Sequence, residues 1–70
     1  MTKDEFIAMC DREIERMKAN NKRVVSFFTI QMTKEDWAQV EKHYEDNNYA
    51  FEDLTCPTCR KNIHDVVIRW

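Results

Sequence analysis

Two cysteines, Cys56 and Cys59, carry the clearest chemical potential in this chain. Two thiols separated by two residues can bind a metal ion or close a disulfide, and Pro57 stiffens the backbone between them. Arg60 and Lys61 follow directly and add two positive charges. Apolar runs lie on both sides of this segment, so we expect it to form a loop between two packed elements.

The segment resembles the zinc knuckle of zinc ribbons, in which two thiolates from a tight turn between antiparallel strands take two of four tetrahedral positions. The resemblance implies a bound zinc ion. Zinc ribbons normally supply a second Cys-x-x-Cys pair, which this chain lacks, and usually place glycine where Arg60 stands. The remaining ligands would come from His64, His43 or Cys10, or from the cysteine pair of a second chain across a dimer axis.

Two other interpretations of the cysteine pair stay open. Cys56-Pro57-Thr58-Cys59 is similar to the Cys-Pro-aromatic-Cys motif of glutaredoxins, which would imply thiol–disulfide exchange. That fold carries its motif near the N-terminus and needs a second proline, whereas this chain has one proline and eleven residues after the motif. The pair can also be a reduced turn without metal. Cys10, on the apolar stripe of a helix, has a simpler interpretation as a small buried hydrophobe.

Size and composition predict one small domain, residues 1–70. A core this small supplies little stability, so a metal, a disulfide or a second subunit is a reasonable expectation. The chain contains no glycine, which excludes P-loops and dinucleotide-binding fingerprints. Its net charge of −2 argues against general nucleic-acid binding.

Three cysteines are an odd number and do not fit a secreted disulfide framework. The sequence has no run of apolar residues long enough for a membrane span and no apolar core of a signal peptide. We therefore expect a cytoplasmic protein.

Two segments have the start signals, end signals and spacing of amphipathic helices. Thr2, with Glu5 three residues later, predicts the start of the first helix, and Thr33 predicts the start of the second. Asn-Asn pairs at positions 20–21 and 47–48 predict the ends, because asparagine tolerates the left-handed conformation better than most residues. The apolar stripes are Phe6, Ile7, Cys10, Ile14 and Met17 in the first helix and Trp37, Val40 and Tyr44 in the second.

Three further segments are predicted as strands. Residues 23–31 are dense in branched and aromatic side chains on both faces, which indicates a central strand. Residues 49–54 are a plausible short strand. Residues 63–70 fit either a strand or a helix, and the Val-Val-Ile run favours a strand. That strand would place four side chains on one face: His64, Val66, Ile68 and Trp70.

These elements predict an α+β fold of order α-β-α-β-β. Two helices should pack on one face of a small, mixed three-stranded sheet. The last two strands should form a hairpin with the Cys-x-x-Cys knuckle at its tip.

No catalytic residue set is found. The acidic residues of the first helix alternate with arginine and lysine at ion-pair spacing, which is typical of a solvated face. A Cys59–His64 nucleophile–base pair would need a buried site that a chain of this size can hardly enclose. We therefore expect a protein that is not an enzyme.

The aromatic residues point instead to protein interaction, because tryptophan and tyrosine are enriched in interface hot spots. Trp70, Tyr49, Arg60 and Lys61 are the predicted partner-binding residues. We expect a small regulator or inhibitor that covers a site on a larger protein, with a homodimer as an option. A chain so small, acidic and free of glycine is in the style of short phage-encoded proteins. The first alternative is a nucleic-acid-associated zinc protein that uses Arg60 and Lys61. The second alternative is a small protein that carries out thiol–disulfide exchange.

Overall fold

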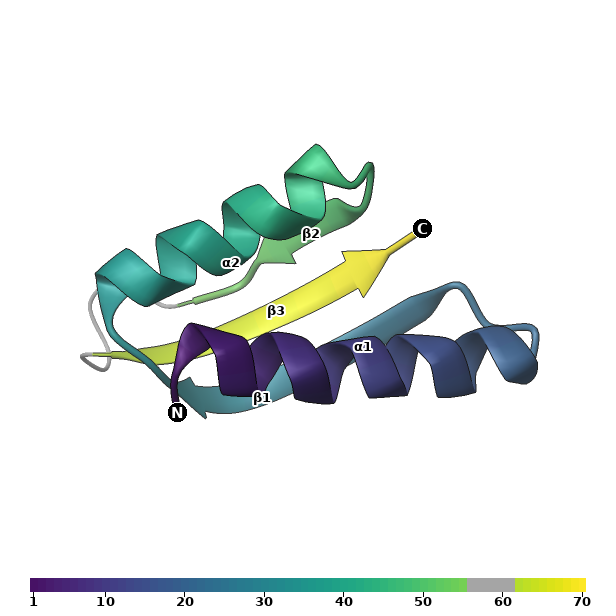
Figure 1. The fold of residues 1–70 in the computed structure, drawn as a ribbon, viewed down its shortest axis with the longest axis horizontal. Helices are drawn as coiled ribbons and strands as arrows, with labels where there is room; N and C mark the ends of the chain where they lie inside the picture. The colour runs from purple at the N-terminus through teal and green to yellow at the C-terminus, as the bar shows by residue number, and fades with distance from the viewer. Residues whose placement is uncertain (56–61) are drawn as a thin grey trace.

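The computed structural model describes residues 1–55 and 62–70, and Figure 1 shows two helices and a three-stranded sheet. The α+β class and the element order α-β-α-β-β are confirmed. The predicted knuckle lies outside the described residues. The elements are α1 (Lys3–Ala19), β1 (Val24–Gln31), α2 (Lys34–Asp46), β2 (Ala50–Asp53) and β3 (Ile63–Arg69).

Both helices begin at the predicted threonines. The Thr2 hydroxyl accepts a hydrogen bond from the Glu5 backbone N–H at 3.2 Å, and the Glu5 carboxylate accepts one from the Thr2 N–H at 3.0 Å. This reciprocal pair satisfies two backbone donors that a helix start would otherwise leave without a partner. The Thr33 hydroxyl accepts a hydrogen bond from the Asp36 N–H at 3.2 Å in the same way.

Both helices also end at the predicted asparagine pairs. Asn20 and Asn47 are the C-caps, and the residues after them, Asn21 and Asn48, have φ angles of 59° and 66°. Asparagine can take this left-handed conformation where a chain without glycine needs it.

Within residues 1–55 and 62–70, no helix combines the length and the apolar character that crossing a membrane requires.

The strand order of the sheet is β1-β3-β2, and both neighbouring pairs are antiparallel. The central strand is therefore β3, and the predictions that β1 is central and that the sheet is mixed are wrong. β1 and β2 run in the same direction, but β3 lies between them, so they do not pair. The last two strands pair with each other as predicted, with Asp53 of β2 opposite Val66 of β3.

A β-bulge in β1 accounts for the error. The register of β1 against β3 shifts between Phe27 and Ile30, and Thr29 has a φ of 59° within this shift. The Thr29 N–H donates a hydrogen bond to the Asp65 carboxylate of β3 at 2.8 Å, so the bulge is tied to the neighbouring strand. An extra residue reverses the side to which the following side chains point.

The bulge gives β1 a single buried face. Ile30 joins Val25 on the side of the helices and both are buried, whereas strict alternation placed Ile30 with Val24 and Phe28. Val24 and Phe28 remain exposed on the other side. A strand with one buried face fits the edge of a sheet, where the structure places it.

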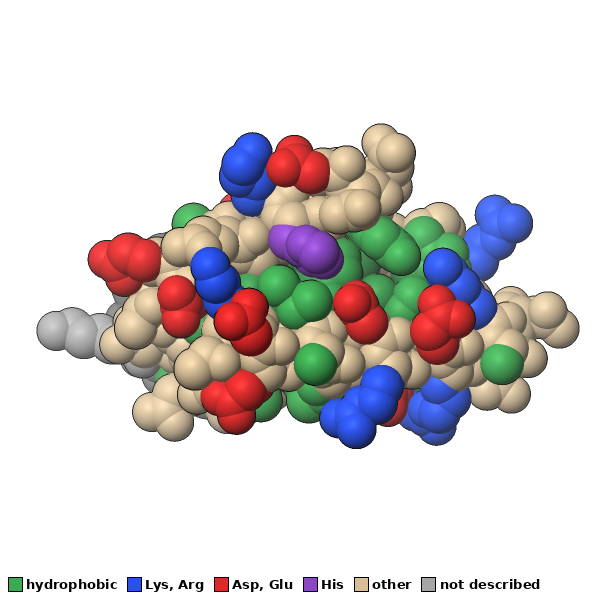
Figure 2. Space-filling model, viewed as in Figure 1, with side chains coloured by type: hydrophobic (Ala, Val, Ile, Leu, Met, Phe, Trp, Pro, Cys, Tyr) green, Lys and Arg blue, Asp and Glu red, His purple; other side chains and the backbone are tan. Residues whose placement is uncertain are grey.

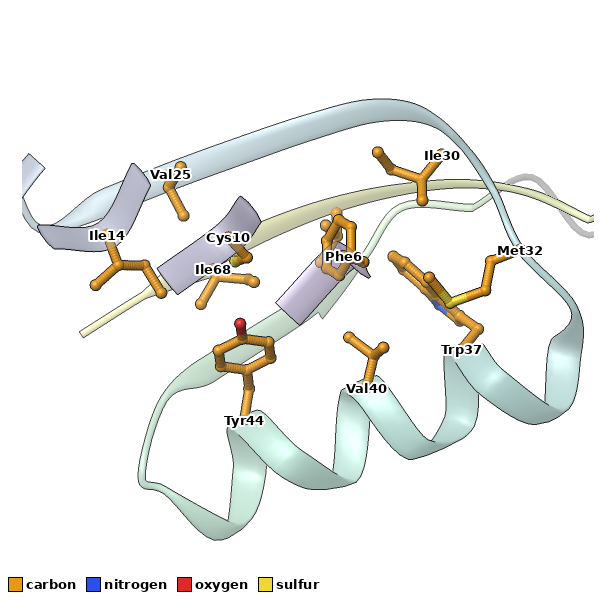
Figure 3. Close-up of a cluster of buried hydrophobic side chains, with 11 residues drawn as sticks. Phe6, Cys10, Ile14, Val25, Ile30, Met32, Trp37, Val40, Tyr44 and Ile68 are labelled. Atoms are coloured by element: carbon orange, nitrogen blue, oxygen red, sulfur yellow. The ribbon is translucent and has the colours of Figure 1, made fainter. Parts of the chain in front are cut away.

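Aromatic contacts join the helices to the sheet. The Phe6 ring of α1 lies 5.3 Å from Phe27 of β1 and 5.7 Å from Trp37 of α2, and Trp37 lies 5.6 Å from Phe51 of β2. Both helices therefore cover the same face of the sheet, as predicted. Figure 3 shows the core between them; its buried apolar residues are Phe6, Cys10, Ile14, Val25, Ile30, Met32, Trp37, Val40, Tyr44, Val66 and Ile68.

Candidate functional site

His64, a predicted metal ligand, is buried on β3 and has a fixed orientation. Its Nε2 lies 2.8 Å from the Met32 backbone oxygen, and because a carbonyl can only accept, Nε2 carries the proton and donates. The imidazole stacks on the Trp37 indole with ring centroids 4.5 Å apart and 10° between the planes. The other nitrogen, Nδ1, lies 3.5 Å from the hydroxyl oxygen of Thr55, the residue before Cys56.

Asp53 and Thr55 form a small polar cluster with His64. The Asp53 carboxylate accepts hydrogen bonds from the Trp37 indole N–H at 3.1 Å and from the Thr55 backbone N–H at 2.9 Å. Burial raises the pKa of Asp53, but the hydrogen bonds from Thr55 and Trp37 outweigh it, so the pKa of this carboxyl is lowered overall. The cluster borders a hollow of about 260 Å³ beside α2.

The described residues do not form a complete metal site. In residues 1–55 and 62–70, no three His, Cys, Asp or Glu side chains lie close enough together to hold a metal ion. Cys56 and Cys59 lie outside these ranges, as do Arg60 and Lys61. An imidazole nitrogen is a ligand type that zinc accepts, and Nδ1 is the His64 nitrogen that is not bonded to Met32.

The other two candidate ligands lie elsewhere. His43 belongs to the last turn of α2 and lines a separate hollow against α1. Trp37, which stacks on His64, lies six residues earlier, which is about 9 Å along the helix axis. Cys10 is fully buried, and burial raises the pKa of its thiol to about 11, which disfavours the thiolate that binds zinc. Cys10 is thus the small buried hydrophobe of the simpler interpretation.

The side of the sheet that faces away from the helices is a second candidate site, and we call it the open face. Its large apolar side chains are well exposed: Phe28 by 61%, Leu54 by 45% and Val24 by 43%. Glu52 and Arg69 form an exposed ion pair across it at 2.6 Å. The open face consists of Val24, Ser26 and Phe28 of β1, Ala50 and Glu52 of β2 with Leu54 after it, and Ile63, Asp65, Val67 and Arg69 of β3.

Sequence analysis missed this surface because it counted Val24 and Phe28 as buried. Ser26 was the available signal, since a polar residue between them on the same side of the strand indicates a face in contact with water.

The helix side has a different character. Figure 2 shows acidic and basic side chains spread over both helices, with apolar side chains between them. Exposed ion pairs of this kind contribute little to stability and are typical of a solvated face, as predicted for the carboxylates of α1. Examples are Glu13–Arg16, Glu15–Lys18 and Lys42–Asp46.

A basic hollow of about 620 Å³ is the third candidate site. It lies between the end of α1 and the start of β1, lined by Lys18, Lys22, Arg23 and Trp70. Trp70 is half-buried and packs edge-on against Tyr49, with ring centroids 6.1 Å apart. The structure thus brings together Trp70 and Tyr49, the two predicted partner-binding residues that it describes.

Comparison with known proteins found no matching family model, no similar curated protein and no similar solved structure. The function is therefore inferred from this chain's own geometry, and three features are available for it: the cluster around His64, the open face and the basic hollow.

The pKa of Cys10 predicts a loss of stability at alkaline pH. An unfolded thiol ionises near pH 9, whereas the folded thiol stays protonated until about pH 11. Between these pH values only the unfolded state gains a thiolate, which stabilises it relative to the folded state. We expect the thiol to lower the free energy of unfolding by roughly 1–2 kcal/mol between pH 8 and pH 10.5. Urea unfolding of the wild type and of Cys10→Ala measures this, because all other groups titrate in both proteins. Parallel pH profiles for the two proteins would contradict the assignment.

Proposed function

We propose that this chain is a non-catalytic, cytoplasmic protein-interaction module: a regulator or inhibitor that binds a larger protein through the open face and covers a site on it. The observation that carries the proposal is the exposure of Phe28, Leu54 and Val24 on one side of the sheet. Contiguous apolar surface flanked by polar groups is typical of interaction sites.

The open face offers both affinity and specificity. Burying Phe28 and Leu54 in a partner would remove apolar surface from water, worth about 1.5–3 kcal/mol for each fully buried side chain. Glu52 and Arg69 lie among these residues and supply one charge of each sign at the surface. Charges at such positions select partners and orient them more than they add affinity.

The side chains that could do chemistry support a binding role. His64 uses Nε2 in a hydrogen bond to the Met32 backbone and its ring in a stack on Trp37, so both interactions hold the fold together. The Cys10 thiol is buried with a raised pKa, which makes it a poor nucleophile.

Substitution of Leu54 tests the open face. Leu54→Lys places a cation on the β2 side of this face, opposite Asp65, and we expect it to weaken the complex about 30-fold, or about 2 kcal/mol. The measurement is quantitative capture of a larger protein by the tagged chain, with the captured protein then titrated in purified form. The matched control is Ala8→Lys, which adds the same charge at an exposed position on α1. Equal affinity of both variants for the partner would place the contact elsewhere.

A zinc ion bound by Cys56, Cys59 and His64 is part of the proposal, with the fourth ligand left open. Zinc would cross-link the ends of β2 and β3, and structural zinc sites contribute of the order of 10 kcal/mol to folding. His64 supports this because it can offer Nδ1 on the side of Thr55.

Native mass spectrometry tests the metal. We expect one zinc per chain, released by acid, and a fall in thermal stability on adding a chelator. The double variant Cys56→Ser/Cys59→Ser should lose both the zinc and the response to chelator, whereas Cys10→Ala should keep them. One zinc per two chains would place the metal between subunits, and a metal-free protein with free thiols would refute the site.

The basic hollow favours nucleic-acid binding as a second candidate function. It combines three cations, Lys18, Lys22 and Arg23, with the half-buried ring of Trp70, and single-stranded nucleic acid binds by phosphate contacts together with base stacking. We expect a fluorescent oligonucleotide to bind more weakly as salt is added, with Lys22→Glu and Trp70→Ala both reducing affinity. No binding at low salt would eliminate this candidate.

A further inference from the structure

The outer edge of β1 is free for pairing. β1 has eight residues and lies at one side of the sheet, and no strand among the described residues pairs with that edge. An unpaired edge strand presents backbone donors and acceptors to any strand of matching shape.

The hydrogen-bond pattern identifies the free groups. The Trp70 N–H donates to the Arg23 backbone oxygen at 3.1 Å, so these residues form a hydrogen-bonded pair. Such pairs alternate along an antiparallel ladder, and Val25 therefore exchanges its hydrogen bonds with Ile68 of β3. The N–H and C=O groups of Val24 and Ser26 point the opposite way, toward the free edge.

We propose that two copies of this chain form a dimer in which their β1 strands pair antiparallel around a two-fold axis at Ser26. In this register Val24 of each copy lies opposite Phe28 of the other. Aromatic and β-branched side chains opposite each other are favourable cross-strand pairs. Ser26 of one copy lies opposite Ser26 of the other. Because the Ser26 N–H and C=O groups point toward the free edge, the two residues can exchange both backbone hydrogen bonds.

Neighbouring registers are poorer. Moving the axis by one residue toward either end puts Phe28 opposite Lys22 or opposite Ser26, so the aromatic ring loses its apolar partner. The Ser26 register also keeps the paired segment, residues 24–28, before the left-handed residue Thr29. A bulge ends regular pairing, and here it sets the length of the usable edge at about 17 Å.

On the helix side of the sheet, a groove borders the free edge of β1. This groove of about 450 Å³ runs between α1 and β1, which Figure 1 shows side by side, and Met17 and Phe27 contribute its apolar part. In the dimer, Phe27 of the second copy lies opposite Val25 and faces this groove. Glu13 and Arg16 of α1 line the groove together with Lys22, so each copy offers charges of both signs to the other.

The dimer would join two open faces into one six-stranded surface, with the Val24–Phe28 pairs at its centre. Leu54 and Val67 of the open face lie away from the shared edge, so they stay exposed to a partner when the dimer forms.

Sedimentation over a range of concentrations tests the dimer. We expect twice the monomer mass of 8.5 kDa at high concentration for the wild type and for Ser26→Ala. Ser26→Pro removes the outward N–H without breaking a β1–β3 hydrogen bond, as proline is tolerated in edge strands, and should weaken association about tenfold or more. A monomer at every concentration, or a dimer unaffected by Ser26→Pro, would overturn the proposal.

Disulfide trapping gives a second readout that stays decisive if Ser26→Pro fails to fold. Residues in a hydrogen-bonded pair have Cα atoms about 5.5 Å apart, within the range of a disulfide. Ser26→Cys should therefore form a covalent dimer on oxidation that the wild type, with the same three native cysteines, does not form. The control Ala50→Cys lies on the same face at the opposite edge and should not. Trapping by Ala50→Cys alone would move the interface to β2 and refute the Ser26 axis. If Leu54→Lys abolishes partner binding while Ser26→Cys still forms the covalent dimer, the two surfaces act separately.

Discussion

The packing of the Trp37 indole is the interaction on which the rest of the structure depends. The ring contacts Phe6 of α1, Phe51 of β2 and His64 of β3, so one side chain of α2 joins the other helix and two strands. The indole N–H, which is the one polar atom of the Trp37 side chain, donates a hydrogen bond to Asp53 and so is satisfied although the side chain is buried. Losing a buried tryptophan costs about 3–5 kcal/mol, and the whole core of so small a domain supplies about as much.

Placing both helices on one face of the sheet leaves the other face and an outer edge without cover. Exposed apolar side chains and unpaired backbone groups are features through which other chains can bind, and both proposals use them. The bulge at Thr29 and the cations Lys22 and Arg23 restrict the usable part of the edge without removing it. The proposed binding surfaces thus follow from the small number of helices and strands.

The residues next to the cysteine pair are ordered by contacts of their own. Met32, Trp37 and Thr55 all contact His64 near the start of β3. A zinc ion at this place would add a cross-link to strands that are already aligned. It would therefore contribute stability more than it would determine the fold.

The sequence by itself determined the features that depend on neighbouring residues. Thr2, Thr33 and the Asn-Asn pairs predicted where both helices begin and end, because capping involves groups only a few residues apart. The strands of residues 23–31 and 63–70 were predicted from their branched and aromatic side chains, although spacing alone left a helix open for residues 63–70. Among candidate ligands, the sequence could name His64 and His43 but could not tell that they lie apart.

The tertiary structure decided the strand order, the antiparallel sheet and the open face. The single buried face of β1 involves Asp65, 36 residues from Thr29, which bonds to the bulge that reverses the direction of the side chains after it. Alternation along one strand does not reveal such a contact, since its cause lies on another strand. Whether Phe28 is buried or exposed is therefore a property of the assembled sheet, and that is why the open face emerged only from the structure.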